Sequence, residues 1–170
     1  MENLWAPWRM EYIEQAANGS GEQGCIFCNR LEQSDDEKNL ILFRGKNAFV
    51  IMNRFPYNNG HLMVVPNRHT GELTEVNPDE AAEMFKLVQL CLQALRKTMS
   101  PHGFNVGMNL GRVAGAGIED HLHYHIVPRW NGDTNFMPVL GNTKVISESL
   151  EKSYGKLHRA LKELKEESGK

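Results

Sequence analysis

The chain of 170 residues lacks several features of secreted, membrane and nucleic-acid-binding proteins. Its three cysteines cannot close a set of disulfides. It begins without a basic segment and apolar signal core, and no uncharged apolar run approaches membrane-spanning length. A formal net charge of −2 provides no global field to hold nucleic acid or an anionic membrane. We therefore expect a single cytoplasmic domain over residues 1–170 that binds neither, with any phosphate binding confined to a local site.

Short runs rich in Val, Ile, Met and Phe, separated by turn residues, predict the strands of a sheet. These runs are 47–53, 60–66, 104–110 and 121–127. The segments 18–24 and 32–39 are rich in turn-forming or charged residues. We interpret them as loops on either side of a small cysteine knuckle, within an N-terminal segment that covers residues 1–40.

Two helices are predicted besides the strands. Asn77-Pro78-Asp79-Glu80 supplies a cap residue, a proline at the first helical position and a glutamate three residues after the cap. Apolar residues then recur at helical spacing, namely Met84, Phe85, Val88, Leu92, Leu95 and Met99. A second amphipathic helix is expected over 145–170. These elements predict an α+β fold with a mainly antiparallel sheet of about five strands, a central helix and a C-terminal helix.

Three of the seven histidines, namely His121, His123 and His125, alternate along one predicted strand. Alternate side chains of a strand share a face, so three imidazoles are expected on one face. Core packing explains this poorly, because each ring has polar nitrogens that need partners. Two chemical interpretations remain. The rings are ligands of one catalytic zinc ion, or one neutral imidazole attacks phosphorus while its neighbours position it and protonate the leaving group.

The segment 111–120, directly before the histidine strand, favours phosphate chemistry. It contains three glycines and is therefore conformationally permissive. Its backbone N–H groups can point at an anion, and Gly117 has no side chain to obstruct the approach.

The residues His121 through Val127 resemble the hallmark of the histidine-triad superfamily, in which three histidines alternate with apolar residues and two further apolar residues follow. Met52-Asn53-Arg54 followed by Asn59-Gly60-His61 is similar to the strand pair that supplies a ribose contact and an additional active-site histidine in that superfamily. Further phrases resemble its bacterial diadenosine-tetraphosphate phosphorylase-like branch. They are Trp5-Ala-Pro-Trp8-Arg9-Met10, Pro101 through Gly111, and Val127 through Phe136.

The resemblance implies a role for each matching residue. His123 would be the nucleophile that attacks the α-phosphorus, while His121, His125 and His61 would orient it, bind phosphate oxygens and handle leaving-group protons. The substrate-binding residues would be Asn53 for the ribose, Asn109 for a phosphate oxygen, and Gly111, Ala116 and Gly117 in the phosphate loop. The expected reaction splits a phosphoanhydride in a dinucleoside polyphosphate, such as diadenosine tetraphosphate, through a covalent nucleotidyl-histidine. The resemblance also implies a homodimer.

One departure from the family pattern concerns the acceptor of the nucleotide. Many relatives carry Gln and then Ser or Thr before the triad, where this chain has Ala116 and Gly117. The smaller side chains leave room for a second anion, so we hypothesise that inorganic phosphate replaces water as the acceptor. Two alternatives stay open: a histidine-triad hydrolase of nucleoside phosphoramidates or adenylates, and a nucleotide-binding regulatory module with little turnover.

Cys25 and Cys28 have the two-residue gap that lets both thiolates bind one zinc ion, which then needs two further ligands. By resemblance to zinc-bearing relatives, His69 and His121 complete a structural Zn²⁺ site, and no organic cofactor is expected. Cys91 is interpreted as a small core residue, whereas His102 and His158 are expected to face solvent.

Overall fold

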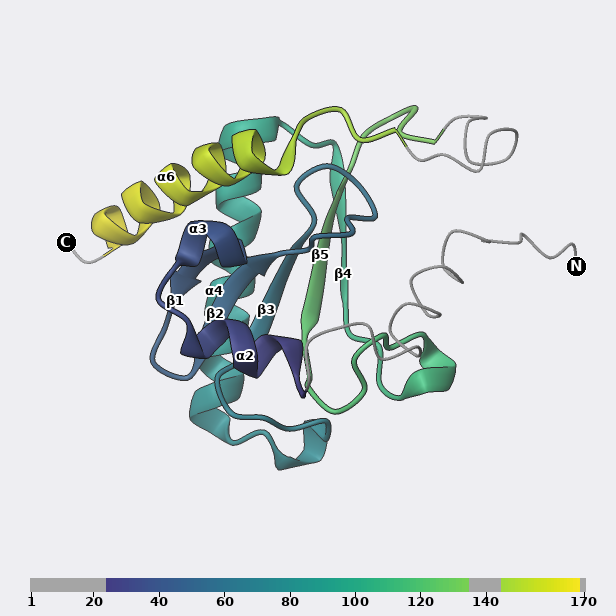
Figure 1. Ribbon diagram of the computed structural model, residues 1–170. Helices are drawn as coiled ribbons and strands as arrows, with labels where there is room; N and C mark the ends of the chain where they lie inside the picture. The colour runs from purple at the N-terminus through teal and green to yellow at the C-terminus, as the bar shows by residue number, and fades with distance from the viewer. Residues whose placement is uncertain (1–23, 135–144, 169–170) are drawn as a thin grey trace, which may run out of the picture.

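The computed structural model describes residues 24–134 and 145–168. Its centre is an antiparallel sheet in the order β1-β2-β3-β5-β4 (Figure 1). The strands are β1 (Ile41–Arg44), β2 (Ala48–Met52), β3 (Leu62–Pro66), β4 (Gly103–Gly107) and β5 (Tyr124–Arg129). The predicted α+β fold with about five mainly antiparallel strands is therefore confirmed.

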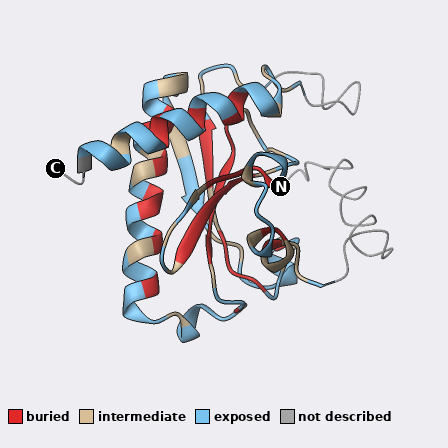
Figure 2. Ribbon diagram, turned by 60° about the vertical axis from the view of Figure 1, so that its left-hand side comes forward, coloured by how far each residue is buried: buried red, intermediate tan, exposed pale blue. Residues whose placement is uncertain are grey.

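Helices lie on both faces of the sheet. The helical elements are α2 (Ile26–Glu32), α3 (Asp36–Asn39), α4 (Pro78–Met99), α6 (Leu150–Ser168) and the 3-10 turns η1 (Leu73–Glu75) and η2 (Arg112–Ala114). Helix α4 packs on β2, β3 and β5, and α6 packs on α4 and β1. Helix α2 lies on the opposite side of the sheet from α4 (Figure 1). Every residue of β2 and β3 is buried, as expected for central strands covered on both faces (Figure 2).

The central helix begins as predicted. The Asn77 side chain accepts from the Glu80 amide, and the Glu80 side chain accepts from the Asn77 amide, so the capping box is complete. The predicted apolar stripe is wrong at Phe85, whose side chain is 58% exposed. The buried residues of the helix run along a slightly rotated stripe that contains Glu80, Met84, Leu87, Val88, Cys91, Ala94 and Leu95. Cys91 is a core residue, as expected.

The C-terminal helix begins at Leu150 rather than at residue 145, because Ser149 ends the preceding irregular segment. The Ser149 carbonyl accepts from the Ser153 amide, and its hydroxyl accepts from the Lys152 amide. His158 is an exposed residue, as expected, but its ring nitrogen Nδ1 also lies 3.1 Å from the Leu42 carbonyl oxygen and bonds it.

The strand predicted over 121–127 is wrong in its first half, since β5 begins at Tyr124. The register pairs Tyr124 with Val64, so the residues before Tyr124 would continue the ladder opposite the end of β3. That end is Pro66, which has no N–H to donate. The Leu122 amide instead donates to the Thr70 carbonyl at 2.7 Å. The chain therefore leaves the sheet where the first two histidines lie.

Three smaller expectations are also corrected. Strand β4 ends at Gly107 rather than at residue 110, the predicted loop 32–39 contains α3, and β1 was not predicted as a strand. The resemblance phrases around Trp5 and Trp8, and the end of the phrase that reaches Phe136, lie outside the described residues, as does most of the loop predicted over 18–24. Over the part of the chain that the structure describes, no helix is long and apolar enough to cross a membrane.

Asp133 links the end of β5 to the loop between β2 and β3. Its carboxylate accepts from the Arg129 guanidinium, the Trp130 amide and the Asn58 side chain. These donors, with Arg129 the strongest, hold the pKa of the Asp133 carboxyl at about 2. A depressed carboxyl pKa stabilises the folded chain above the unfolded value near 4, and this contribution is lost as the pH falls through about 2.

We expect Asp133→Asn to lower the free energy of unfolding by about 1–2 kcal/mol at pH 7, because the neutral amide cannot form the ion pair with Arg129. The difference from the wild type should shrink as the pH is lowered from 5 towards 2. Urea denaturation at pH 7, 4 and 2.5 measures this difference. A difference that stays constant with pH would contradict the assignment of the stabilisation to the ionised carboxylate.

Candidate active site and metal centre

His123 lies directly before β5 and against Phe27 near the start of α2, and it is buried, with 6% of its surface exposed. Its ring Nδ1 lies 2.9 Å from the carbonyl oxygen of His121. A carbonyl can only accept, so Nδ1 carries the proton and donates, and the lone pair is on Nε2. Burial lowers the pKa of His123 below its usual value, although the bond to the carbonyl opposes this. His123 is therefore a neutral imidazole at pH 7 with its lone pair on Nε2, the form in which an imidazole can act as a nucleophile.

His61 and His125 form a hydrogen-bonded pair beside His123. The Tyr57 amide donates to Nδ1 of His61 at 3.1 Å, so this nitrogen carries no proton. Neutral His61 is thus protonated at Nε2, which lies 3.0 Å from Nδ1 of His125 and donates to it. In neutral His125 the proton must then be on Nε2, on the far side of the ring. The His125 ring is 4.7 Å from the His123 ring, centroid to centroid.

The turn before His61 is fixed by a glycine. Gly60 has φ +73°, a conformation that other residues adopt at a cost of about 1–2 kcal/mol. A Cβ at this position would lie 2.6 Å from the Met99 sulfur and 3.0 Å from Leu95 Cδ2. The turn therefore packs directly on the C-terminal end of α4, and His61 follows it in the chain.

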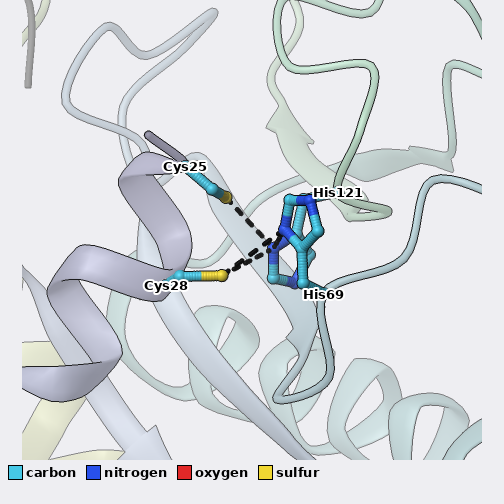
Figure 3. Close-up of side chains that lie close together, drawn as sticks. All are labelled: Cys25, Cys28, His69 and His121. Atoms are coloured by element: carbon cyan, nitrogen blue, oxygen red, sulfur yellow. Dashed lines mark hydrogen bonds between the residues drawn. The ribbon is translucent and has the colours of Figure 1, made fainter. Parts of the chain in front are cut away.

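His121 faces a different group of side chains from the other two histidines. Cys25, Cys28, His69 and His121 form a cluster whose ligand atoms all lie within 4.8 Å of one another (Figure 3). The His121 ring donates from Nε2 to the Pro66 carbonyl at 2.8 Å, which leaves the Nδ1 lone pair directed at the cluster. From Nδ1 the distances are 3.2 Å to the Cys25 sulfur and 3.2 Å to Nδ1 of His69.

The donor set of this cluster fits a zinc ion. Two thiols and two imidazoles make a four-ligand set of the kind found in closed structural zinc sites. Burial, followed by the neighbouring Cys25, raises the pKa of the Cys28 thiol to about 11. A thiol in that environment needs a cation nearby to become a thiolate. The interpretation with all three triad histidines as ligands of one metal finds no support, because the only described cluster that could hold a metal contains His121 alone of the three.

The segment that carries His69 is anchored on both sides. The Arg68 guanidinium donates to both carboxylate oxygens of Glu80 at 3.0 Å, and Glu80 is 6% exposed. Arg68 lowers the pKa of the Glu80 carboxyl, so this acid stays ionised. On the other side, the Thr70 carbonyl accepts from Leu122. The start of α4 thus holds His69 against the segment that contains His121.

Phe27 connects the cysteine pair to the histidines. It lies on α2 between Cys25 and Cys28 and is fully buried. Its ring centroid is 5.4 Å from that of His121 and 5.2 Å from that of His123. Helix α2 and its N-cap residue Cys25 therefore supply two thiols to the candidate metal cluster and an aromatic ring against His123.

The predicted substrate-binding residues lie in two places. Asn53 follows β2, and its side-chain nitrogen lies 3.3 Å from Nδ1 of His61. Asn109 donates to the Gly115 carbonyl, and the Ala116 amide donates to the Gly111 carbonyl at 3.3 Å. Asn53 is thus brought to the histidines, whereas Asn109, Gly111 and Ala116 bond within the loop itself, which also contains Gly117.

Sequence reasoning missed two aromatic residues of this site. Phe27 stands between the two cysteines, and Tyr57 stands in the loop before His61. The only sign of them in the sequence is that an aromatic residue stands within the cysteine pair and another shortly before His61, where neither metal binding nor the histidine requires one. Phe27 contacts His121 and His123, and Tyr57 contacts His125, residues far away along the chain, and spacing within a motif does not report such contacts.

A five-stranded antiparallel sheet with alternating histidines at the start of its β5 strand, directly after a glycine-rich loop, is the arrangement of a histidine-triad protein. The family model described as "HIT domain" matches residues 34–132, which is more than half of the chain. The chain therefore belongs to the HIT domain family.

Two relatives and one solved structure indicate its position within that family. The chain is 41% identical over 155 residues to "AP-4-A phosphorylase" of Mycobacterium tuberculosis, a match that covers 88% of this chain and 79% of the relative. It is 32% identical over 117 residues to the asymmetrical bis(5'-nucleosyl)-tetraphosphatase of Schizosaccharomyces pombe, covering 69% and 60%. A Zn-bound histidine triad family protein from Mycobacterium smegmatis superposes with a TM-score of 0.68 at 29% identity, covering 86% and 99%.

Proposed function

We propose that this protein is an enzyme that cleaves a phosphoanhydride bond of dinucleoside polyphosphates such as diadenosine tetraphosphate, through a nucleotidyl-His123 intermediate. The observation that carries the proposal is the fixed tautomer of buried His123, whose Nδ1–H is bonded to the His121 carbonyl. Support for the substrate class comes from the names of two relatives, a phosphorylase of AP-4-A and a bis(5'-nucleosyl)-tetraphosphatase.

In the first step, Nε2 of His123 attacks the α-phosphorus, a P–N bond forms and the anhydride P–O bond breaks. The leaving polyphosphate keeps the electron pair. The Nε2–H of His125 donates a hydrogen bond to the departing oxygen, and the bond from His61 keeps that proton on Nε2. The carbonyl of His121 stabilises the positive charge that develops on the attacking ring.

In the second step, inorganic phosphate or water attacks the phosphorus of the intermediate and the P–N bond breaks. We propose that phosphate is the acceptor, with Asn53 at the ribose and with Asn109, Gly111, Ala116 and Gly117 at the phosphates. The small side chains of Ala116 and Gly117 support this choice, since they leave room for a second anion. The Asn109 side chain then exchanges its bond to Gly115 for one to a phosphate oxygen.

The acceptor determines which products are formed. We expect diadenosine tetraphosphate and phosphate to give one ADP and one ATP, because the adenylyl group moves to phosphate and ATP leaves. Transfer to water would give AMP and ATP instead. Anion-exchange chromatography of the products, with and without phosphate, distinguishes the two. AMP as the sole adenylyl product at saturating phosphate would contradict phosphorolysis and leave hydrolysis as the reaction.

Structural zinc belongs to the same proposal, with Cys25, Cys28, His69 and His121 as ligands. When bound, the zinc ion would link α2, through coordinate bonds, to the segments that carry His69 and His121. The Zn-bound mycobacterial neighbour supports this assignment. Free thiols at such a site fit the reducing cytoplasm, where we place the protein.

We also propose that the chain is one domain that forms a homodimer. The edge strand β4 has three exposed residues in sequence, Asn105 to Gly107, and Val106 is 45% exposed. Such an edge offers backbone groups for pairing with a second copy. Sedimentation velocity gives the assembly state.

A further inference from the structure

Tyr57 covers the His61–His125 pair from the solvent side. It lies in the loop 53–61 between β2 and β3, and its ring is stacked on that of His61 with centroids 4.8 Å apart and an interplanar angle of 25°. The centroid of the His125 ring is 5.8 Å from the same ring. Tyr57 is 40% exposed, whereas His61 beneath it is 1% exposed. One aromatic residue therefore contacts both histidines and is itself partly exposed to solvent.

The loop that carries Tyr57 is fixed independently of the ring. The Asn58 side chain donates to the Pro128 carbonyl and to Asp133, both beside the end of β5. The side-chain oxygen of Asn53 accepts a hydrogen bond from the Phe55 amide. The Tyr57 amide donates to His61 through the backbone, which a side-chain substitution leaves in place. Removal of the ring should therefore leave the loop and the His61 tautomer intact.

We propose that Tyr57 is a positioning residue for the hydrogen bond that His125 donates to the leaving group. The inference rests on the proposed function, because it assigns a role within that reaction. The Tyr57 ring, stacked on His61 and tilted against His125, holds the His61 Nε2–H in line with His125 Nδ1 and excludes water that would compete for either nitrogen. A hydrogen bond between two imidazoles is stronger in a dry environment. The ring thus keeps the proton of His125 on Nε2, directed away from His61.

A positioning role through His125 differs from a packing role in its dependence on the leaving group. A leaving group that departs easily gains little from a hydrogen bond, whereas a poor one gains much. A series of adenosine 5'-phosphate aryl esters, from p-nitrophenyl to phenyl, varies the leaving group while the adenylyl group stays constant. Diadenosine tetraphosphate is measured in parallel as the proposed substrate.

We expect Tyr57→Ala to reduce kcat up to about tenfold with the phenyl ester and less than about twofold with the p-nitrophenyl ester. Tyr57→Phe keeps the ring and should retain the wild-type dependence on the leaving group. Tyr57→Leu fills the space without an aromatic face and should behave like Tyr57→Ala, which separates stacking from volume. Phe55→Ala, which removes an aromatic ring that is 57% exposed in the same loop, is the control and should reduce both esters equally or not at all.

A second measurement does not depend on turnover. The proton between His61 and His125 should give a downfield ¹H NMR signal in the wild type and in Tyr57→Phe, and this signal should broaden by exchange with water in Tyr57→Ala. In a His61→Gln background, Tyr57→Ala should add little further loss, because the pair it positions is already absent.

An equal loss in Tyr57→Ala for both esters, or a Tyr57→Phe loss as large as that of Tyr57→Ala, would overturn the role of Tyr57 while leaving the proposed function standing. A wild-type enzyme that cleaves neither the esters nor diadenosine tetraphosphate would overturn the proposed function and this inference with it.

Discussion

His123→Asn is expected to reduce turnover of diadenosine tetraphosphate by on the order of 10⁴- to 10⁶-fold, the range seen when an enzyme loses its nucleophile. Asparagine can still donate from its side-chain amide to the His121 carbonyl, so the fold should survive. It has no nucleophilic nitrogen corresponding to Nε2. Intact-protein mass spectrometry after rapid quenching should therefore show a nucleotidyl adduct on the wild type and none on the variant.

The matched control for this experiment is His102→Asn. His102 is exposed, and its Nδ1 accepts a bond from the Asn131 amide. This variant should keep wild-type activity and form the adduct at the wild-type rate. Full activity of His123→Asn, without an adduct in either protein, would contradict covalent catalysis. Faster decay of the wild-type adduct with added phosphate would independently identify phosphate as the acceptor.

Cys25→Ser and Cys28→Ser, singly and together, are expected to remove bound zinc and to lower thermal stability. Serine keeps the size of cysteine but is a poor ligand for zinc at neutral pH, so the four-ligand set is broken. A metal present at about 1,000 times its Kd stabilises the folded chain by about 4 kcal/mol, and this contribution would be lost. Inductively coupled plasma mass spectrometry measures zinc per chain, and differential scanning calorimetry measures the melting temperature.

Cys91→Ala is the control for the loss of a thiol. Cys91 is buried on α4 and belongs to the hydrophobic core. Its substitution should lower stability through packing while zinc stays at the wild-type level. Zinc retained at full stoichiometry in Cys25→Ser would contradict the assignment of this cysteine as a ligand. A melting temperature of the double variant that a chelator still lowers would point to a metal bound elsewhere.

Local signals in the sequence predicted much of the fold because they act within a few residues. Asn77 and Glu80 form their capping box within one helical turn, and an isolated segment contains all the information needed. The position of Phe85 on the helix could not be predicted in the same way. Neighbouring residues at helical spacing are almost equally apolar, and only the direction in which α4 packs on the sheet decides which of them is exposed.

The start of β5 was misplaced for a related reason. Alternation of histidines with apolar residues continues through His121 and His123, but a strand also needs a partner that can donate. Pro66 lacks an N–H, and Thr70 supplies the carbonyl that Leu122 uses instead. The missing donor at Pro66 can be recognised in the sequence only when the register that pairs 121–127 with 60–66 is already known.

Candidate site residues were predictable where a side chain defines the chemistry. The motifs that contain His69 and the two cysteines led to a cluster that could hold a metal, and it consists of the four expected side chains. The motif that contains His61 led to a residue that the fold pairs with His125. Orientation was not predictable. The Pro66 and His121 carbonyls fix which ring nitrogen of His121 and of His123 carries the proton, and a backbone carbonyl has no signature in a sequence.

The place of Phe27 restricts how this family member can vary. A metal knuckle defined only by its two cysteines tolerates almost any pair of residues between them. Here one of that pair, Phe27, contacts His123, the proposed nucleophile, so we expect exchange at position 27 to disturb His123 even when both cysteines are kept, whereas Ile26 is only partly buried against the core. In saturation mutagenesis of residues 26 and 27, we therefore expect two kinds of effect. Substitutions of Ile26 should change mainly the stability of the fold, whereas substitutions of Phe27 should change mainly the rate of the proposed reaction.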